Sequence, residues 1–179
     1  MASCSQEKQP TDSSVFGITL TSLEHQPFSL AELAKQKASV IIFLQPECPF
    51  CNSYGKTLRL LDSTLTGEKI QLVGVVAGKN YPEDEINDYQ QKHQLKFPIL
   101  LDPDFLLTKK LKATTTPEAF LIDNSGAVRY RGMIDNWGYE IGKVRAKVTE
   151  HYLDNAVKAY VHNRPILLDS TKAVGCYIE

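Results

Sequence analysis

The chain has 179 residues, of which 42% are hydrophobic and 23% charged, enough for one soluble domain with a substantial core. Its formal net charge of −1 gives no electrostatic reason to expect a nucleic acid or an anionic membrane surface as a partner. The longest apolar run, residues 38–44, is shorter than the roughly 18–20 residues of a membrane span, so no transmembrane helix is predicted.

Residues 1–14, MASCSQEKQPTDSS, are polar and aperiodic, which is typical of a flexible tether. They contain no basic region followed by an apolar stretch, so they do not form an intact signal peptide. However, "MASC" resembles the end of a bacterial lipoprotein signal, where small residues precede a cysteine that becomes the lipidated N-terminus. That resemblance implies a lipid anchor on Cys4, and the alternative is an unmodified cytoplasmic N-terminus.

Strands and helices are predicted to alternate through residues 15–112. In order they are a hairpin within 15–30, a helix at 29–36 capped by Ser29, a strand at 38–45, a helix from Pro49 to Leu60, a strand at 69–78, a helix within 81–95, a strand at 96–102 and a helix at 104–112. The run 38–45 is β-branched and largely apolar, as in a central strand buried on both faces, and 69–78 is predicted to be a second buried strand.

The last third of the chain begins with a hairpin within 114–135, around the Asn-Ser-Gly turn. A long helix is expected within 139–164, and a final strand carries Cys176. One face of that helix is predicted to hold five side chains: Val148, Tyr152, Ala156, Ala159 and Tyr160. The whole pattern predicts an α/β domain over 15–179, with a mixed sheet covered by helices and no internal repeat or linker.

Cys48 and Cys51 are two residues apart, where a buried strand gives way to a helix. Helix N-termini present unpaired N–H groups and a positive dipole end, so a thiolate at Cys48 would be stabilised. Cys51 would lie nearby in the first helical turn and more shielded. The pair therefore suits a two-step exchange, in which Cys48 attacks a disulfide and Cys51 resolves the mixed disulfide.

Two other interpretations of the pair remain open. A structural zinc site needs four ligands, but there is no second Cys-x-x-Cys, and the four histidines are scattered at His25, His93, His151 and His162. Alternatively, the two cysteines are inert and packed in the core. We expect no metal and no cofactor other than a redox-active Cys48–Cys51 disulfide.

A strand, Cys-x-x-Cys at a helix start, a further strand and helix, and Thr-Pro before a closing hairpin together resemble the thioredoxin superfamily. "CPFC" is similar to the glutaredoxin dipeptide pattern, and "TTP" at 115–117 to the cis-proline loop of the redoxin (AhpC/TSA-like) branch. That branch includes membrane-tethered bacterial thiol–disulfide oxidoreductases, and the last third resembles a lipoprotein-type subgroup. The resemblance covers about residues 15–179 and implies a thioredoxin-like fold with an N-terminal hairpin and a C-terminal extension.

The resemblance implies an enzyme that exchanges disulfides with an exported protein partner, in the periplasm or cell envelope and as a monomer. Thr116–Pro117 would be a cis peptide bond facing the cysteines, with the backbone of Thr116 free to bind an extended substrate. The alternative is a trans proline that starts a strand. Pro49, Phe50 and Trp137 are the other residues expected to contact substrate, although core packing is the default for a lone tryptophan.

The chain departs from the thioredoxin pattern at two positions. Glu47 precedes the first cysteine, where thioredoxins have tryptophan, and no acid occurs within 39–44, where they carry a buried aspartate. The proton acceptor for the second cysteine is therefore unassigned. Glu118, directly after Pro117, is the first candidate, and the alternative is a solvent-facing strand residue.

Cys176 follows a glycine near the C-terminus, a setting in which the resembled subgroup also has a cysteine. It is either a third redox thiol that exchanges with Cys48 and Cys51 or a buried structural thiol.

Two other activities occur on related folds, peroxide reduction and Cu(I) transfer. Peroxiredoxins need Thr or Ser three residues before the nucleophile, and Gln45 stands there, so peroxidase activity is not supported. The alternative function is a Cu(I) metallochaperone of thioredoxin fold, because soft thiolates select Cu(I). That function would require His151 or His162 as a third ligand.

Overall fold

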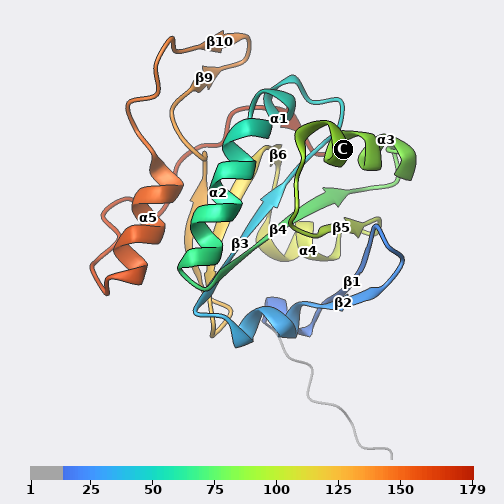
Figure 1. Ribbon diagram of the computed structural model, residues 1–179, viewed down its shortest axis with the longest axis horizontal. Coiled ribbons are helices and arrows are strands. Elements are labelled where there is room, and N and C mark those ends of the chain that lie inside the picture. The colour runs from blue at the N-terminus through green and yellow to red at the C-terminus, as the bar shows by residue number, and fades with distance from the viewer. Residues whose placement is uncertain (1–13) are drawn as a thin grey trace, which may run out of the picture.

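A seven-stranded mixed sheet forms the centre of the computed structural model, which describes residues 14–179 (Figure 1). In spatial order the strands are β2 (Pro27–Ser29), β1 (Thr19–Ser22), β5 (Ile99–Asp102), β4 (Ile70–Ala77), β3 (Ala38–Phe43), β7 (Glu118–Asp123) and β8 (Val128–Gly132). The central β3, β4 and β5 are parallel, and every other pairing is antiparallel. The predicted mixed sheet and both predicted hairpins are confirmed.

Helices cover both faces of this sheet (Figure 1). One face carries α1 (Pro49–Ser53), α2 (Gly55–Gly67), α3 (Glu83–His93) and α5 (Tyr152–Val161). The other face carries α4 (Leu106–Leu111) and the 3-10 helices η1 (Val15–Gly17) and η2 (Leu30–Lys35). Because β3 is covered on both sides, all six of its residues are buried, which agrees with its largely apolar sequence.

Two small sheets lie outside the central one. β9 (Gly138–Glu140) and β10 (Lys143–Val144) form a short hairpin before α5. β6 (Thr115–Thr116) pairs with β11 (Cys176–Tyr177), which is the predicted final strand. Within residues 14–179 the longest apolar helices are too short to cross a membrane.

The helix predicted from Pro49 to Leu60 is instead two consecutive helices that run on to Gly67. The break falls at Tyr54, and the ring of His93 packs so closely on the following Gly55 that a Cβ would collide with it. The tether predicted for residues 1–14, including Cys4, lies outside the described residues except for Ser14, which caps η1.

The last helix is also shorter than predicted. Gly142 turns the chain back with φ +74°, so residues 138–144 form a hairpin, and α5 begins only at Tyr152. Val148 is therefore not on the helix. The buried face consists of Leu153, Ala156 and Val157, so of the predicted set only Ala156 is fully buried.

Candidate active site

Cys48 is the N-cap residue of α1, at the end of the short segment 44–48 that joins β3 to the helix. Pro49 occupies the start of the helix, as predicted, where no N–H is needed. The Asn52 side chain fixes this junction, because its Nδ2 donates hydrogen bonds to the carbonyl oxygens of Pro46 at 2.6 Å and Cys48 at 3.1 Å. Asn52 thus ties the segment before Cys48 to the first turn of the helix.

The two cysteines of the motif have opposite electrostatic settings. Hydrogen bonds, the largest from the Cys51 thiol and a further one from the Cys176 thiol, lower the pKa of Cys48 to about 5 against the opposing effect of burial. Burial, followed by the adjacent Cys48 thiolate, raises the pKa of Cys51 well above its ordinary value. At neutral pH the site therefore holds one thiolate beside one thiol, both as free cysteines.

The Thr116–Pro117 peptide bond is cis and lies against Cys48. When protonated, the Cys48 thiol donates a hydrogen bond to the carbonyl oxygen of Thr116, with an S–O distance of 3.3 Å. Thr116 Oγ1 in turn donates to Gln45 Oε1 at 2.8 Å. The proline loop and the cysteine turn are therefore joined by direct polar contacts.

Cys176 reaches the same place from the C-terminal strand. β11 runs antiparallel to β6, with Cys176 opposite Thr116 and Tyr177 opposite Thr115. This corrects the expectation that the Thr116 backbone is free for an extended substrate, because the chain's own C-terminal segment occupies that edge. Burial and the hydrogen bond and charge of Cys48 raise the pKa of Cys176 to about 12.

The predicted substrate-contacting residues divide into two groups. Pro49 is exposed beside Cys48, whereas Phe50 is buried and packs edge-on against Trp137 with 6.0 Å between ring centroids. Trp137 also packs against Tyr54, 5.5 Å away, and is partly buried. Trp137 thus packs against Phe50, one of the two residues between the cysteines.

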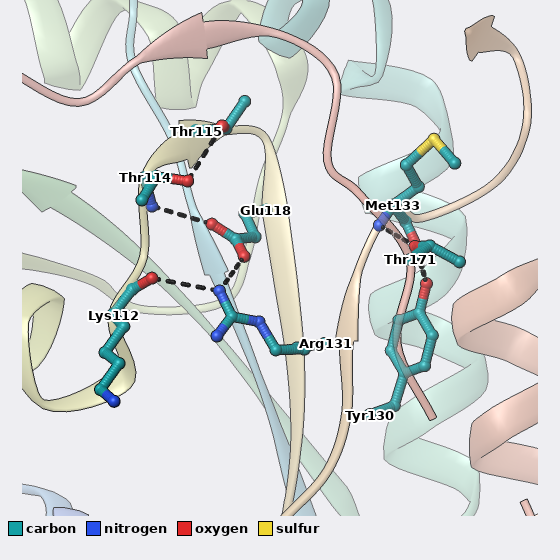
Figure 2. Close-up of polar contacts among 8 residues, drawn as sticks. All are labelled: Lys112, Thr114, Thr115, Glu118, Tyr130, Arg131, Met133 and Thr171. Atoms are coloured by element: carbon teal, nitrogen blue, oxygen red, sulfur yellow. Dashed lines mark hydrogen bonds and ion pairs between the residues drawn. The ribbon is translucent and has the colours of Figure 1, made fainter. Parts of the chain in front are cut away.

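Glu118 is not placed to take a proton from Cys51, and its assignment as proton acceptor is wrong. Its side chain is on the opposite face of the sheet, where Oε1 accepts from Arg131 at 2.8 Å and Oε2 accepts from the Thr114 backbone N–H at 2.9 Å (Figure 2). The carboxylate side chain is only 4% exposed, so the alternative of a solvent-facing residue is wrong too. Strand alternation explains this, because Ala119, not Glu118, faces the cysteines.

The sequence analysis did not predict that two polar residues hold the site together through hydrogen bonds. Gln45, which is 7% exposed, bridges the site, since its Oε1 accepts from Thr116 and its Nε2 donates to the Tyr177 carbonyl oxygen at 3.2 Å. Asn52 fixes the turn as described above. The available signal for Gln45 was a polar residue at the end of a largely apolar run. Among residues 14–179, no group of three or more His, Cys, Asp or Glu side chains is arranged to hold a metal ion.

A mixed sheet with helices on both faces, and a Cys-x-x-Cys turn set against a cis-proline loop, define a protein of the thioredoxin-like fold. The chain belongs to the AhpC/TSA family, whose model matches residues 13–131. The C-terminal segment that carries Cys176 lies beyond the matched part.

Similar proteins agree with this assignment. Sporulation thiol-disulfide oxidoreductase A of Bacillus subtilis is 24% identical over 128 residues, covering 71% of this chain and 75% of the relative. The structure of a hypothetical protein from Sinorhizobium meliloti aligns with a TM-score of 0.80 at 23% identity, covering 90% of this chain and 89% of that one. A secreted disulfide oxidoreductase of Mycobacterium tuberculosis aligns with a TM-score of 0.58 at 19% identity, over 82% and 95% of the two chains. Relatives and structural neighbours of this chain thus include thiol–disulfide oxidoreductases.

Proposed function

We propose that this protein is a thiol–disulfide oxidoreductase that exchanges disulfides with an exported protein partner. The observation that supports it best is the pairing of a Cys48 whose pKa is lowered to about 5 with a Cys51 whose pKa is raised. Only a thiolate attacks a disulfide, and the resolving thiol must stay protonated until the mixed disulfide has formed. No cofactor other than the Cys48–Cys51 disulfide is needed.

In the reducing direction, the Cys48 thiolate attacks one sulfur of the partner's disulfide. A Cys48–partner disulfide forms, and the other partner sulfur leaves as a thiolate and takes up a proton. Cys51 then loses its proton and attacks the Cys48 sulfur, which forms the Cys48–Cys51 disulfide and releases the second partner thiolate. Two electrons pass from the protein to the partner, and the reverse sequence oxidises it.

The low pKa of Cys48 bears on direction, because a stabilised thiolate stabilises the reduced form. We therefore expect a midpoint potential above the thioredoxin value of about −270 mV and toward the value of about −120 mV of the strong oxidant DsbA. The test is a titration in glutathione buffers, with free thiols alkylated and the tryptic peptides weighed.

A reversible two-electron transition within the peptide of residues 38–56, which holds both cysteines, would support the proposal. No disulfide at any potential would overturn it. Copper(I) binding that survives dialysis, without disulfide reductase activity, would then favour the metallochaperone instead.

For location, we propose a cell-envelope protein carried by a lipid on Cys4 and acting as a monomer. The sequence MASC supports the lipid anchor, and the secreted structural neighbour from M. tuberculosis supports a location outside the cytoplasm. Mass spectrometry of the N-terminus of the native protein tests it. A lipidated Cys4 is the expected result, and an unmodified Met1 would contradict the anchor and favour the cytoplasm.

A further inference from the structure

The C-terminal strand lies where an extended substrate would lie. Beyond the pairing of β11 with β6, the Ile178 N–H donates to the Thr114 carbonyl oxygen at 3.0 Å, and Gln45 Nε2 donates to the Tyr177 carbonyl oxygen at 3.2 Å. Such backbone pairing along an exposed strand edge is how many proteins hold extended peptides. Here the bound peptide is the chain's own end, with its cysteine opposite Thr116.

Gly175 allows this close approach. It is buried, and a Cβ in its place would collide with the carbonyl oxygen of Thr116. No positive φ is required of Gly175, so the need for glycine there is one of space. The contact between β11 and the cis-proline loop is therefore specified by the sequence.

The strand register and the close approach at Gly175 together place the Cys176 thiol beside the Cys48 thiol. Cys176 lies opposite Thr116, whose carbonyl oxygen is 3.3 Å from the Cys48 sulfur, and both cysteines line one depression of about 310 Å³ together with Gln45, Tyr81 and Tyr177. Cys48 is only 2% exposed, whereas Cys176 is partly exposed. A disulfide entering this depression therefore meets Cys176 beside Cys48.

We propose that the C-terminal strand is an internal substrate and that Cys176 is a third catalytic thiol, which forms a disulfide with Cys48 in exchange with Cys51. This inference rests on the proposed function and adds a third thiol to it. The oxidant is the disulfide of the partner that the proposed function supplies.

The exchange takes three successive attacks on sulfur. The Cys48 thiolate attacks the partner disulfide, one partner thiolate leaves, and a Cys48–partner disulfide remains. Cys176 loses its proton and attacks the Cys48 sulfur, so the Cys48–Cys176 disulfide forms and the second partner thiolate leaves with the proton. Cys51 then loses its proton and attacks Cys48, and Cys176 leaves as a thiolate and is reprotonated. The partner has gained two electrons, and the protein ends with the Cys48–Cys51 disulfide.

The test uses the full chain with Cys51→Ser and Cys4→Ser, so that Cys48 and Cys176 are the two remaining cysteines. The protein is incubated with oxidised glutathione, digested with trypsin without reduction, and weighed. We expect peptide 38–56 linked to peptide 173–179 by a disulfide, with no glutathione retained.

Each other outcome identifies what has failed. If Cys48 retains glutathione while Cys176 stays a free thiol, the inference is overturned and the proposed function stands. If Cys48 does not react with oxidised glutathione at all, the nucleophile itself is misassigned and the proposed function fails with it.

Gly175→Ala in the same background is the matched control, because it keeps both thiols and forces β11 away from Thr116. We expect loss of the linked peptide and accumulation of Cys48–glutathione, with thermal unfolding showing that the domain is still folded. Linkage undiminished by Gly175→Ala would show that the strand does not position Cys176 and would overturn the internal-substrate part of the inference.

Discussion

Cys48 has two thiol neighbours that come from very different parts of the chain. Cys51 lies three residues further on, in the first turn after the N-cap, and is fully buried. Cys176 arrives on a two-residue strand at the other end of the chain and is partly exposed. Both thiols lower the pKa of Cys48, and Cys51 lowers it more than Cys176 does.

The difference shows two ways of building the same contact. The position of Cys51 follows from local helix geometry, so it needs little beyond Pro49 and the turn held by Asn52. The position of Cys176 depends on Gly175, Gln45 and the pairing of β11 with β6. A short strand with few buried contacts is easier to displace than a helix turn in the core. We therefore expect the Cys176 contact to be the more adjustable of the two.

Removal of Cys48, which both other thiols contact, should have the largest effect on activity. Cys48→Ser is expected to lower disulfide reductase activity by more than about 10³-fold, because the nucleophile is lost to both neighbours. Reduction of insulin, followed by turbidity, measures this. If Cys48→Ser kept activity near wild type, Cys176 or Cys51 would have to attack the substrate directly. Cys48 would then not be the nucleophile that the other two thiols serve.

The next largest effect should be that of pH on the rate at which Cys48 of the wild-type protein is alkylated. Since the pKa of Cys48 is lowered to about 5, its thiolate fraction is full at neutral pH and falls as the pH drops through that value. Alkylation of Cys48 by iodoacetamide should therefore be nearly constant from about pH 6 to pH 8 and lose about half its rate near pH 5. An inflection near the ordinary value of about 8.5 would show that neither thiol stabilises the thiolate.

Cys51→Ala removes the neighbour that contributes most to the lowered pKa of Cys48. A hydrogen bond to a charged group is worth about 1.5–3 kcal/mol, so the inflection of the Cys48 alkylation profile should move up by about 1–2 pH units. Cys176→Ala should move it in the same direction by less, because its contribution is smaller. Equal shifts in the two variants, measured by the same alkylation assay, would contradict the ranking of the two neighbours.

Most of the fold could be predicted from the sequence, and the local half of the site with it. The apolar runs that became β3 and β4, and the Cys48–Pro49 helix start, are local patterns with one reasonable interpretation. The meeting of Cys176 with Cys48 depends on strand register between distant segments, which no local pattern encodes. The error at Glu118 had the same origin, because adjacency to Pro117 in sequence said nothing of which sheet face its side chain takes.

Glu118→Gln should have the smallest effect on the two thiol neighbours. It breaks the ion pair with Arg131 and leaves a buried, weaker hydrogen-bonding group, so the free energy of unfolding should fall by about 1–3 kcal/mol. At about 2–4 °C per kcal/mol, calorimetry resolves that loss. Glu140→Gln, at the exposed Lys143–Glu140 pair, is the matched control and should cost less than about 0.5 kcal/mol.

The Cys48 alkylation profile should stay unchanged in both variants, because the Glu118 carboxylate and the thiols are on opposite faces of the sheet. Slowed resolution of a Cys48–glutathione disulfide in Glu118→Gln alone would restore Glu118 as a proton acceptor for Cys51.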